Sequence, residues 1–265
     1  MANDGSQNPS VHTYYCNLES RIGYWLFLGN TRHCGLYEKG RIWPFPISKA
    51  QRRTEEKLFN RLGLEPGSEV LDAGIGSEYV AMYMAEKGLY VDGVDIIPSH
   101  VEDAKRNIKA HGLEDKISIR LGDYQNLIDF PDGSFDGIYT METFVHADDP
   151  VKAIQGFYRL LRPGGALVHH EADIHSESEV IQDVLRLSHC LNVLEEGTLR
   201  QTLEDVGFKD VNLEDLTAEG IIGYVPYRIL QFFGLQDRFT NIMASVETYL
   251  NRETGRYISV KAVKY

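Results

Sequence analysis

The chain has 265 residues, of which 43% are apolar, and a formal net charge of −12. This length and composition suit one α/β domain with additions, or two small domains, around a sizeable core. The acidic balance argues against unaided binding to nucleic acid or to anionic membranes, because both favour basic surfaces.

The cysteines point to a reducing compartment. Cys16, Cys34 and Cys190 are far apart and odd in number, so they match neither a disulfide framework nor a metal-ligand spacing. The first ten residues lack the apolar stretch of a signal peptide, and no run approaches the roughly 18 apolar residues of a membrane span. We therefore expect a cytoplasmic protein without a membrane span.

About sixty residues precede the first predicted strand. Residues 1–10 are polar and are expected to be disordered, and residues 11–28 are rich in aromatic side chains. Ile47–Leu62 has the pattern of a charged amphipathic helix, with Ser48 as its N-cap and Gly63 beyond its end. Residues 1–63 are too irregular for an independent domain, so we expect a helical cap over the ligand edge of the sheet.

Strands and helices then alternate at short spacing, which predicts a parallel sheet. The expected strands are Glu69–Asp72, Tyr90–Asp95, Ile117–Leu121, Gly137–Thr140 and Ala166–His170. The expected helices are Tyr79–Lys87, Ser99–His111, Val151–Leu161 and Glu177–Leu194.

The last part of the chain departs from this alternation. We expect a helix over Thr198–Val206 that is closed by Gly207, and strands over Val211–Leu216 and Tyr257–Val263. A long helical segment, Pro226–Leu250, lies between those strands. Residues 64–265 are thus predicted to form the core, with a helical lid inserted at about 217–255.

The segment from Val70 to Ala81 organises this core. A buried strand leads into Gly74 and Gly76, and a helix follows, so backbone N–H groups and a helix N-terminus meet at one point. Asp95 ends the next strand about twenty residues later, where an acid binds ribose hydroxyls in doubly wound sheets. The dinucleotide fingerprint fails, because Tyr79 stands where its third glycine would be. We predict a nucleoside-containing ligand.

The remaining pattern, Asp-x-Gly-x-Gly from Asp72, resembles the first motif of class I S-adenosylmethionine-dependent methyltransferases. Later segments resemble the same family, and within it the branch that includes sterol and tocopherol methyltransferases. They are Leu121–Tyr124, Phe130–Asp136, Met141–Pro150 with its Glu-x-x-x-His-Ala pattern, and Tyr158–Gly165. Gly29–Tyr37 and the dipeptide Ala50-Gln51 resemble segments of the family's cap.

The resemblance implies a Rossmann-like, seven-stranded, mostly parallel sheet whose last strand is antiparallel. It also implies S-adenosyl-L-methionine as the cofactor, with Asp95 at the ribose and Asp123 at the adenine amino group. The full set of expected cofactor-binding residues is Gln51, Asp72, Ala73, Gly74, Gly76, Asp95, Ile96, Asp123, Tyr124 and Met141.

Glu78 departs from the family pattern, which has a third glycine at this position. A carboxylate that pointed inward would repel the cofactor's own carboxylate. If Glu78 pointed outward from the first turn of the helix, it would instead interact favourably with the helix dipole. We favour the outward orientation; the alternative is a weakened or repurposed cofactor site.

Three residues are candidates for catalysis. His146 follows the fourth strand and is the first candidate for a general base, because its ordinary pKa suits proton transfer. Glu142 could orient His146 or a substrate amine, and His33 lies in the cap. Each could equally have a structural role.

The expected substrate-binding residues are Tyr15, Tyr24, Trp25 and His170. Most of the aromatic side chains in the cap and lid are expected to be ordinary packing. The remainder would suit a hydrophobic or aromatic small molecule. No spacing of histidine and acidic residues suggests a metal.

Three functions remain open on the sequence. The first is an S-adenosylmethionine-dependent methyltransferase that acts on carbon, nitrogen or oxygen of a small hydrophobic metabolite. The second keeps the fold and uses the pocket for cyclisation or rearrangement in specialised metabolism, and Glu78 is the feature that favours it. The third is a non-catalytic partner subunit. The acceptor and the oligomeric state do not follow from the sequence.

Overall fold

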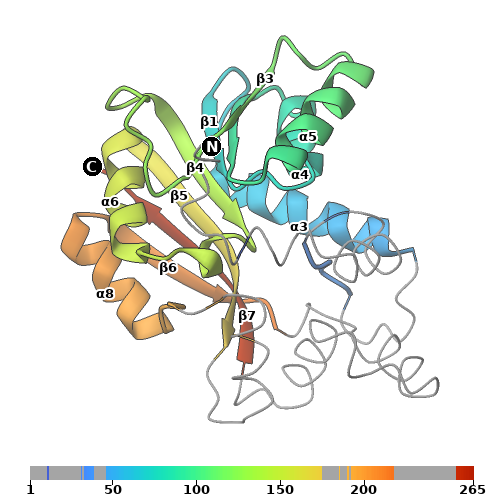
Figure 1. The fold of residues 1–265 in the computed structure, drawn as a ribbon. Coiled ribbons are helices and arrows are strands. Elements are labelled where there is room, and N and C mark those ends of the chain that lie inside the picture. The colour runs from blue at the N-terminus through green and yellow to red at the C-terminus, as the bar shows by residue number, and fades with distance from the viewer. Residues whose placement is uncertain are drawn as a thin grey trace.

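The computed structural model describes residues 11, 31, 33–38, 46–174, 185, 190, 192–217 and 255–265. These residues form a twisted β-sheet with helices on both of its faces (Figure 1). The expected helix at Pro226–Leu250, most of the expected helix at Glu177–Leu194, most of the expected lid, and most of the expected cap before Ile47 lie outside the described residues. Residues 192–194, at the expected end of the Glu177–Leu194 helix, are described and are not helical.

The sheet has seven strands in the order β3-β2-β1-β4-β5-β7-β6. The strands are β1 (Glu69–Ala73), β2 (Tyr90–Asp95), β3 (Ile117–Leu121), β4 (Phe135–Met141), β5 (Leu161–Ile174), β6 (Lys209–Asp215) and β7 (Gly255–Val263). β7 is antiparallel to both of its neighbours, β5 and β6, while the pairs from β3 to β5 are parallel. The predicted Rossmann-like sheet with an antiparallel last strand is therefore confirmed.

Five α-helices flank the sheet in the described part of the chain. They are α3 (Ile47–Leu62), α4 (Tyr79–Glu86), α5 (Pro98–Ala110), α6 (Pro150–Leu160) and α8 (Glu196–Val206), and a 3-10 turn, η1 (Phe144–His146), follows β4. Figure 1 shows α3, α4 and α5 on one face, and α6 and α8 on the other.

Alternating side chains of the central strands fill a core on each face. Tyr139 of β4 belongs to the cluster with Leu58 of α3, whereas its neighbour Ile138 belongs to the cluster with Phe157 of α6. All four side chains are fully buried. This division follows from the period of two residues along a strand, which sends successive side chains to opposite faces.

The structure corrects one cap and lengthens several of the expected strands, β5 most of all. α3 begins at Ile47 after Pro46 and has no side-chain cap, so Ser48 is a helix residue and the expected Ser48 N-cap is wrong. Gly63 closes α3 in the left-handed conformation, as predicted. β5 continues to Ile174 because residues beyond His170 pair with β7 as far as Gly255.

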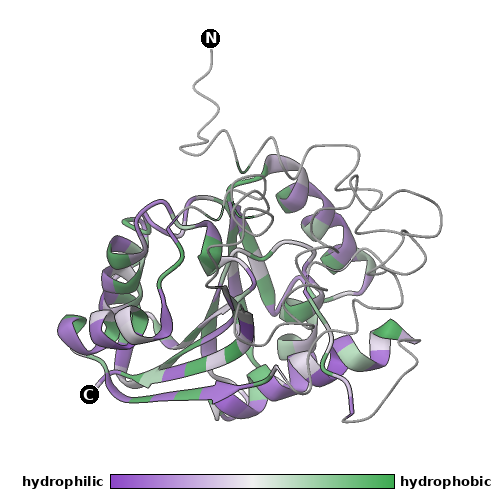
Figure 2. Ribbon diagram, turned by 90° about the horizontal axis from the view of Figure 1, so that it is seen from below, coloured by the Kyte–Doolittle hydropathy of each residue, from purple (hydrophilic) through white to green (hydrophobic). Residues whose placement is uncertain are grey.

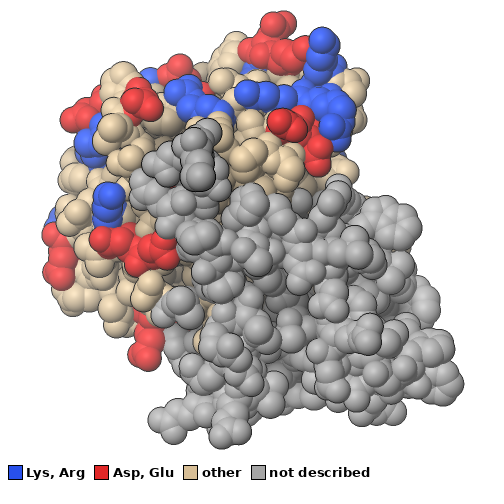
Figure 3. All heavy atoms as spheres, viewed as in Figure 1, with Lys and Arg blue, Asp and Glu red and all other residues tan. Residues whose placement is uncertain are grey.

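One face of the described part carries side chains of both charges. Figure 2 shows helices with hydrophilic and hydrophobic sides, and Figure 3 shows acidic and basic side chains interleaved on one face. Among the residues that the structure describes, no helix is long and apolar enough to cross a membrane.

Two Gly→Ala substitutions test this packing. A Cβ at Gly165 would lie 2.9 Å from the carbonyl oxygen of Arg162 and 3.1 Å from that of Asp136, whereas a Cβ at Gly156 in α6 would meet nothing within 4 Å. We expect Gly165→Ala to lower the free energy of unfolding by about 1–3 kcal/mol, because backbone must move. Gly156→Ala should raise it by about 0.5–1 kcal/mol. Thermal unfolding of both variants measures these changes in the free energy of unfolding. The same change in both variants would contradict the packing described for Gly165.

Candidate active site

A pocket lies at the carboxyl ends of β1, β2 and β4, where the loops after these strands meet. Several segments far apart in the chain contribute its walls. The lining residues are Val11, His33, Asp72, Gly74, Ile75, Gly76, Ser77, Val80, Asp95, Ile96, Ile97, His100, Asp123, Tyr124, Gln125, Met141, Glu142, Thr143 and His146.

The glycine turn after β1 forms the floor of this pocket. Gly74 and Gly76 have φ values of 97° and 55°, in the left-handed region that favours glycine. A Cβ at Gly74 would lie 2.7 Å from Cβ of Thr143, so this position has no room for a side chain. The turn therefore needs glycine both for its backbone conformation and for its contact with the loop after β4.

Asp95 at the end of β2 fixes the same turn from the other side. Its carboxylate accepts hydrogen bonds from the backbone N–H groups of Gly76, at 2.9 Å, and Ile97, at 2.8 Å. Nδ1 of His100 lies 3.3 Å from it. Burial alone would raise the pKa of Asp95, but His100 and the two N–H groups hold it below its ordinary value. Asp95 is thus an ionised acceptor inside the pocket.

Asp72 has the opposite electrostatic character. It is buried at the end of β1, and Tyr139 donates a hydrogen bond to its Oδ2 at 2.9 Å. Burial raises the pKa of Asp72 to about 7, and the Tyr139 hydroxyl offsets only part of that rise. The pocket therefore contains one carboxylate that is ionised and one that titrates near neutral pH.

The loop after β3 closes the far wall. Oδ1 of Asp123 accepts a hydrogen bond from the backbone N–H of Gln125 at 2.8 Å. The hydroxyl of Tyr124 donates to the carbonyl oxygen of Thr143 at 2.9 Å, which ties this loop to the turn after β4. The two residues expected at an adenine group thus lie side by side on one wall.

Glu142 joins three segments of the chain. It follows β4 in the left-handed conformation, with φ 54°. Its Oε1 accepts hydrogen bonds from the N–H of Cys34, at 2.7 Å, and from the hydroxyl of Tyr257 in β7, at 2.9 Å. Burial raises the pKa of Glu142, although these donors and His33 work against the rise. Oε1 of Glu142 thus connects the cap to β7.

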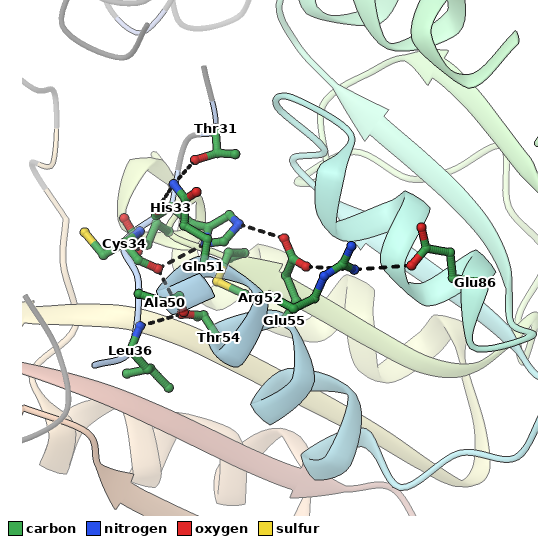
Figure 4. Close-up of polar contacts among 12 residues, drawn as sticks. Thr31, His33, Cys34, Leu36, Ala50, Gln51, Arg52, Thr54, Glu55 and Glu86 are labelled. Atoms are coloured by element: carbon green, nitrogen blue, oxygen red, sulfur yellow. Dashed lines mark hydrogen bonds and ion pairs between the residues drawn. The ribbon is translucent and has the colours of Figure 1, made fainter. Parts of the chain in front are cut away.

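His33 lies between two glutamates. Its Nε2 is 3.5 Å from Oε1 of Glu55 in α3, and its Nδ1 is 3.1 Å from the carbonyl oxygen of Cys34 (Figure 4). Burial lowers the pKa of His33, but Glu55 and Glu142 together raise it above its ordinary value. Gln51 supports this wall from behind: its Nε2 donates to Thr31 and, at 3.4 Å, to the carbonyl oxygen of His33.

His146, in η1, also faces the pocket, and its Nδ1 lies 3.6 Å from Sγ of Cys190. The structure thus brings together all three candidate catalytic residues, His33, Glu142 and His146. Two of the expected cofactor residues, Gln51 and Ala73, lie behind the wall and do not line it. The carbonyl oxygen of Ala73 accepts a hydrogen bond from Thr143 at 2.7 Å.

The structure does not bring His170, one of the expected substrate residues, to the pocket. His170 is fully buried in β5, and neither of its ring nitrogens has a hydrogen-bond partner. Burial, with smaller effects from Arg61 and His33, lowers the pKa of His170 to about 3. Tyr15, Tyr24 and Trp25 lie outside the described residues.

Glu78 takes neither of the two expected orientations. It is 2% exposed, so the predicted outward orientation is wrong, and it does not line the pocket. Its Oε1 accepts a hydrogen bond from Asn107 of α5 at 2.6 Å. The backbone at Glu78 has φ 53°, so the left-handed conformation that a glycine would favour is kept. An inward repulsion of a ligand therefore has no support in this geometry.

Sequence reasoning missed several lining residues. Several of them are close in sequence to the motif residues, and this proximity could have indicated that they line the pocket. They are Ile75, Ser77, Val80, Ile97, Gln125 and Thr143. Nothing in the sequence pointed to Val11, or to Tyr257 behind Glu142. In the described part of the chain, no group of three or more histidine, cysteine or acidic residues could hold a metal ion.

Comparison with known proteins places this pocket in a family. The methyltransferase domain family matches residues 71–169. The S-adenosyl-L-methionine-dependent Diels-Alderase iccD of Talaromyces variabilis is 36% identical over 96% of this chain and 94% of its own length. The Diels-Alderase iliD of Neonectria sp. (strain DH2), also described as S-adenosyl-L-methionine-dependent, is 36% identical over 77% of this chain and 84% of its own.

A solved structure shares the fold. A geranyl diphosphate methyltransferase, in complex with GPP and sinefungin, superimposes with a TM-score of 0.79 at 19% identity, over 97% of this chain and 98% of that chain.

Replacement of Glu142 tests its role in joining the segments. Glu142→Ala would strand the N–H of Cys34 and the hydroxyl of Tyr257, so we expect the free energy of unfolding to fall by about 1–3 kcal/mol. Burial raises the pKa of the Cys34 thiol well above its ordinary value, and loosening of the cap should make that thiol more reactive. Alkylation of Cys34, measured by peptide mass spectrometry with Cys190 as the internal reference, checks this. Unchanged alkylation of Cys34 would contradict the proposed link.

Proposed function

Because the chain belongs to the class I S-adenosylmethionine-dependent methyltransferase family, and because a relative 36% identical over nearly its whole length is a Diels-Alderase, we propose that it is an S-adenosyl-L-methionine-dependent cyclase. Its substrate would be a linear polyene that carries both a conjugated diene and an alkene activated by a carbonyl group. That near-full-length similarity is the observation that carries the proposal.

The residues of the pocket fit the cofactor. Asp95 is an ionised acceptor that keeps unused lone pairs for ribose hydroxyls, and Asp123 offers acceptors for an exocyclic amine. Ile96 and Tyr124 offer flat or apolar surface beside them. The turn at Gly74 and Gly76 lets a ligand approach the main chain closely. When bound, the cofactor supplies a positively charged sulfonium.

A cyclisation of this kind needs no base. The π electrons of diene and alkene form two new σ bonds and one new π bond, and no proton, electron or leaving group is transferred. The protein must therefore fold the chain of the substrate so that its reacting ends meet, and such positioning can supply most of the acceleration. A hydrogen bond to the substrate carbonyl would accelerate the reaction further, and His146, which faces the pocket, is our candidate donor.

The contacts of Glu142 favour cyclisation over methyl transfer to carbon or oxygen. Such methyl transfer requires an acceptor to lose a proton to a base. Oε1 of Glu142 already accepts hydrogen bonds from Cys34 and Tyr257, and His33 is buried beside Glu55. Two of the three candidate bases are thus engaged in holding the cap. Methyl transfer remains the second candidate function, since the matched family is a methyltransferase domain.

One experiment separates the two reactions. The protein is incubated with methyl-labelled S-adenosylmethionine and an extract rich in linear polyenes, and the products are analysed by mass spectrometry. We expect an isomer of unchanged mass and altered retention, formed only when the cofactor is present and without incorporation of label. A product that gains the labelled methyl group would show methyl transfer and overturn the cyclase proposal.

A second experiment tests the cofactor site alone. Asp95→Ala should weaken binding of S-adenosylmethionine by about 1–3 kcal/mol, because ribose hydroxyls would lose a charged acceptor. Asp103→Ala on the exposed surface of α5 is the matched control and should leave the dissociation constant unchanged, since Asp103 pairs only with Arg106 among the contacts described. Titration calorimetry measures both variants. Equal affinities for the two would contradict the placement of the ribose.

A further inference from the structure

Glu171 is a buried acid directly behind the pocket wall. It lies near the end of β5, is 4% exposed, and does not line the pocket. Its Oε1 accepts a hydrogen bond from the backbone N–H of Phe144 at 3.1 Å. Phe144 begins η1, and both Thr143 just before this turn and His146 at its end line the pocket. Glu171 thus holds the turn that forms this part of the wall.

A chain of short contacts continues from Glu171 into the sheet. Oγ1 of Thr140 lies 2.6 Å from Oε1 of Glu171 and 2.8 Å from Nδ1 of His169. The His169 ring stacks on Phe144, with ring centroids 4.6 Å apart. The hydroxyl of Thr140 carries one proton, so it can donate to only one of its two neighbours. If Glu171 carries a proton on Oε1, it donates to Thr140, and Thr140 donates to His169.

Among the described residues that interact with Glu171, none is a cation that would stabilise a negative charge. The titratable groups around it are His169 on its own strand, Tyr124 after β3, Glu142 after β4 and Tyr257 on β7. Burial lowers the pKa of His169 to about 3, so that imidazole is neutral. In the part of the chain that the structure describes, Oε2 of Glu171 has no hydrogen-bond partner. A bare carboxylate here would be desolvated and would lie near another acid, which disfavours the ionised form.

We propose that Glu171 is a positioning residue of the pocket: it is an uncharged carboxylic acid that pins Phe144 and thereby sets the turn that carries Glu142, Thr143 and His146. Loss of its proton would reverse the hydrogen bonds through Thr140 and place an unpaired charge behind the wall. This role of Glu171 concerns the pocket wall, so it is the same whether the enzyme catalyses cyclisation or methyl transfer. Only the measurement of S-adenosylmethionine affinity rests on the proposed function.

The pH dependence follows from the direction of the shift. Burial raises the pKa of Glu171 from 4.5 to about 8, so between these values the folded protein binds more protons than the unfolded chain does. The stability of the folded state against unfolding therefore falls as pH rises through this window, and the loss is complete above about pH 8. Glutamine has the size of the protonated acid but cannot ionise.

Glu171→Gln and Glu171→Ala test the proposal together. The infrared spectrum of the wild type should contain a protonated-carboxyl band that is absent from Glu171→Gln and disappears above about pH 8. The melting temperature of Glu171→Gln relative to wild type should rise from about pH 5 to pH 8. Glu171→Ala should weaken S-adenosylmethionine binding about tenfold at neutral pH. Glu171→Gln should bind the cofactor as tightly as the wild type does at that pH. Above pH 8, only the wild type should lose further affinity.

The results that would overturn the proposal are separate from those that would overturn the cyclase. If wild type and Glu171→Gln have identical carboxyl bands at neutral pH, Glu171 is ionised and the proposal is wrong. If Glu171→Gln binds the cofactor as weakly as Glu171→Ala does, the charge is required and the proposal is again wrong. If the chain binds no cofactor at all, the proposed function fails, while the infrared band and the melting temperatures still decide the state of Glu171.

Discussion

Two distant parts of the chain converge on the carboxylate of Glu142, and a third pairs with its backbone. Its Oε1 accepts from Cys34 in the cap and from Tyr257 in β7, while its own N–H donates to the carbonyl oxygen of His170 in β5. The cap is held to the sheet at the point where the pocket opens. A left-handed backbone at a non-glycine residue costs about 1 kcal/mol or more, and these hydrogen bonds offset that strain. The position of His33, next to Cys34 in the cap, depends on this arrangement.

Much of the fold could be predicted because it depends on local patterns. Ile47–Leu62, Tyr90–Asp95 and Ile117–Leu121 have the predicted bounds, since their apolar periods and glycine stops are explicit in the sequence. The pocket residues in the glycine motif followed from the family resemblance. Tyr257, Glu171 and the buried position of Glu78 could not be predicted, because each depends on which strand or helix packs beside it. Glu78 has a left-handed backbone and accepts a hydrogen bond from Asn107 of α5. This contact depends on tertiary packing and leaves no periodic pattern in the sequence.

The same architecture is compatible with two chemistries because different hydrogen bonds support the cofactor site and Glu142, with Thr143 as the contact between the two. Asp95 and the glycine turn are held by backbone hydrogen bonds among β1, β2 and α5. Glu142 and His146 are held by the turn after β4, the cap and β7. A substitution near Glu142 and His146 can change the reaction of a bound substrate, while Asp95 and the glycine turn continue to bind the cofactor. Retention of the Asp-x-Gly-x-Gly turn is therefore compatible with loss of methyl transfer.

The strand order has a consequence for biosynthesis. β6 joins the sheet only through β7, and β7 is the last described strand to leave the ribosome. Until then β6 has no partner, β5 has an open edge, and Glu142 lacks the hydroxyl of Tyr257. The nascent polypeptide can assemble β1 to β5 during translation, but its pocket matures only after β7 has been made. A chaperone that shields the open edge of β5 would act during that interval.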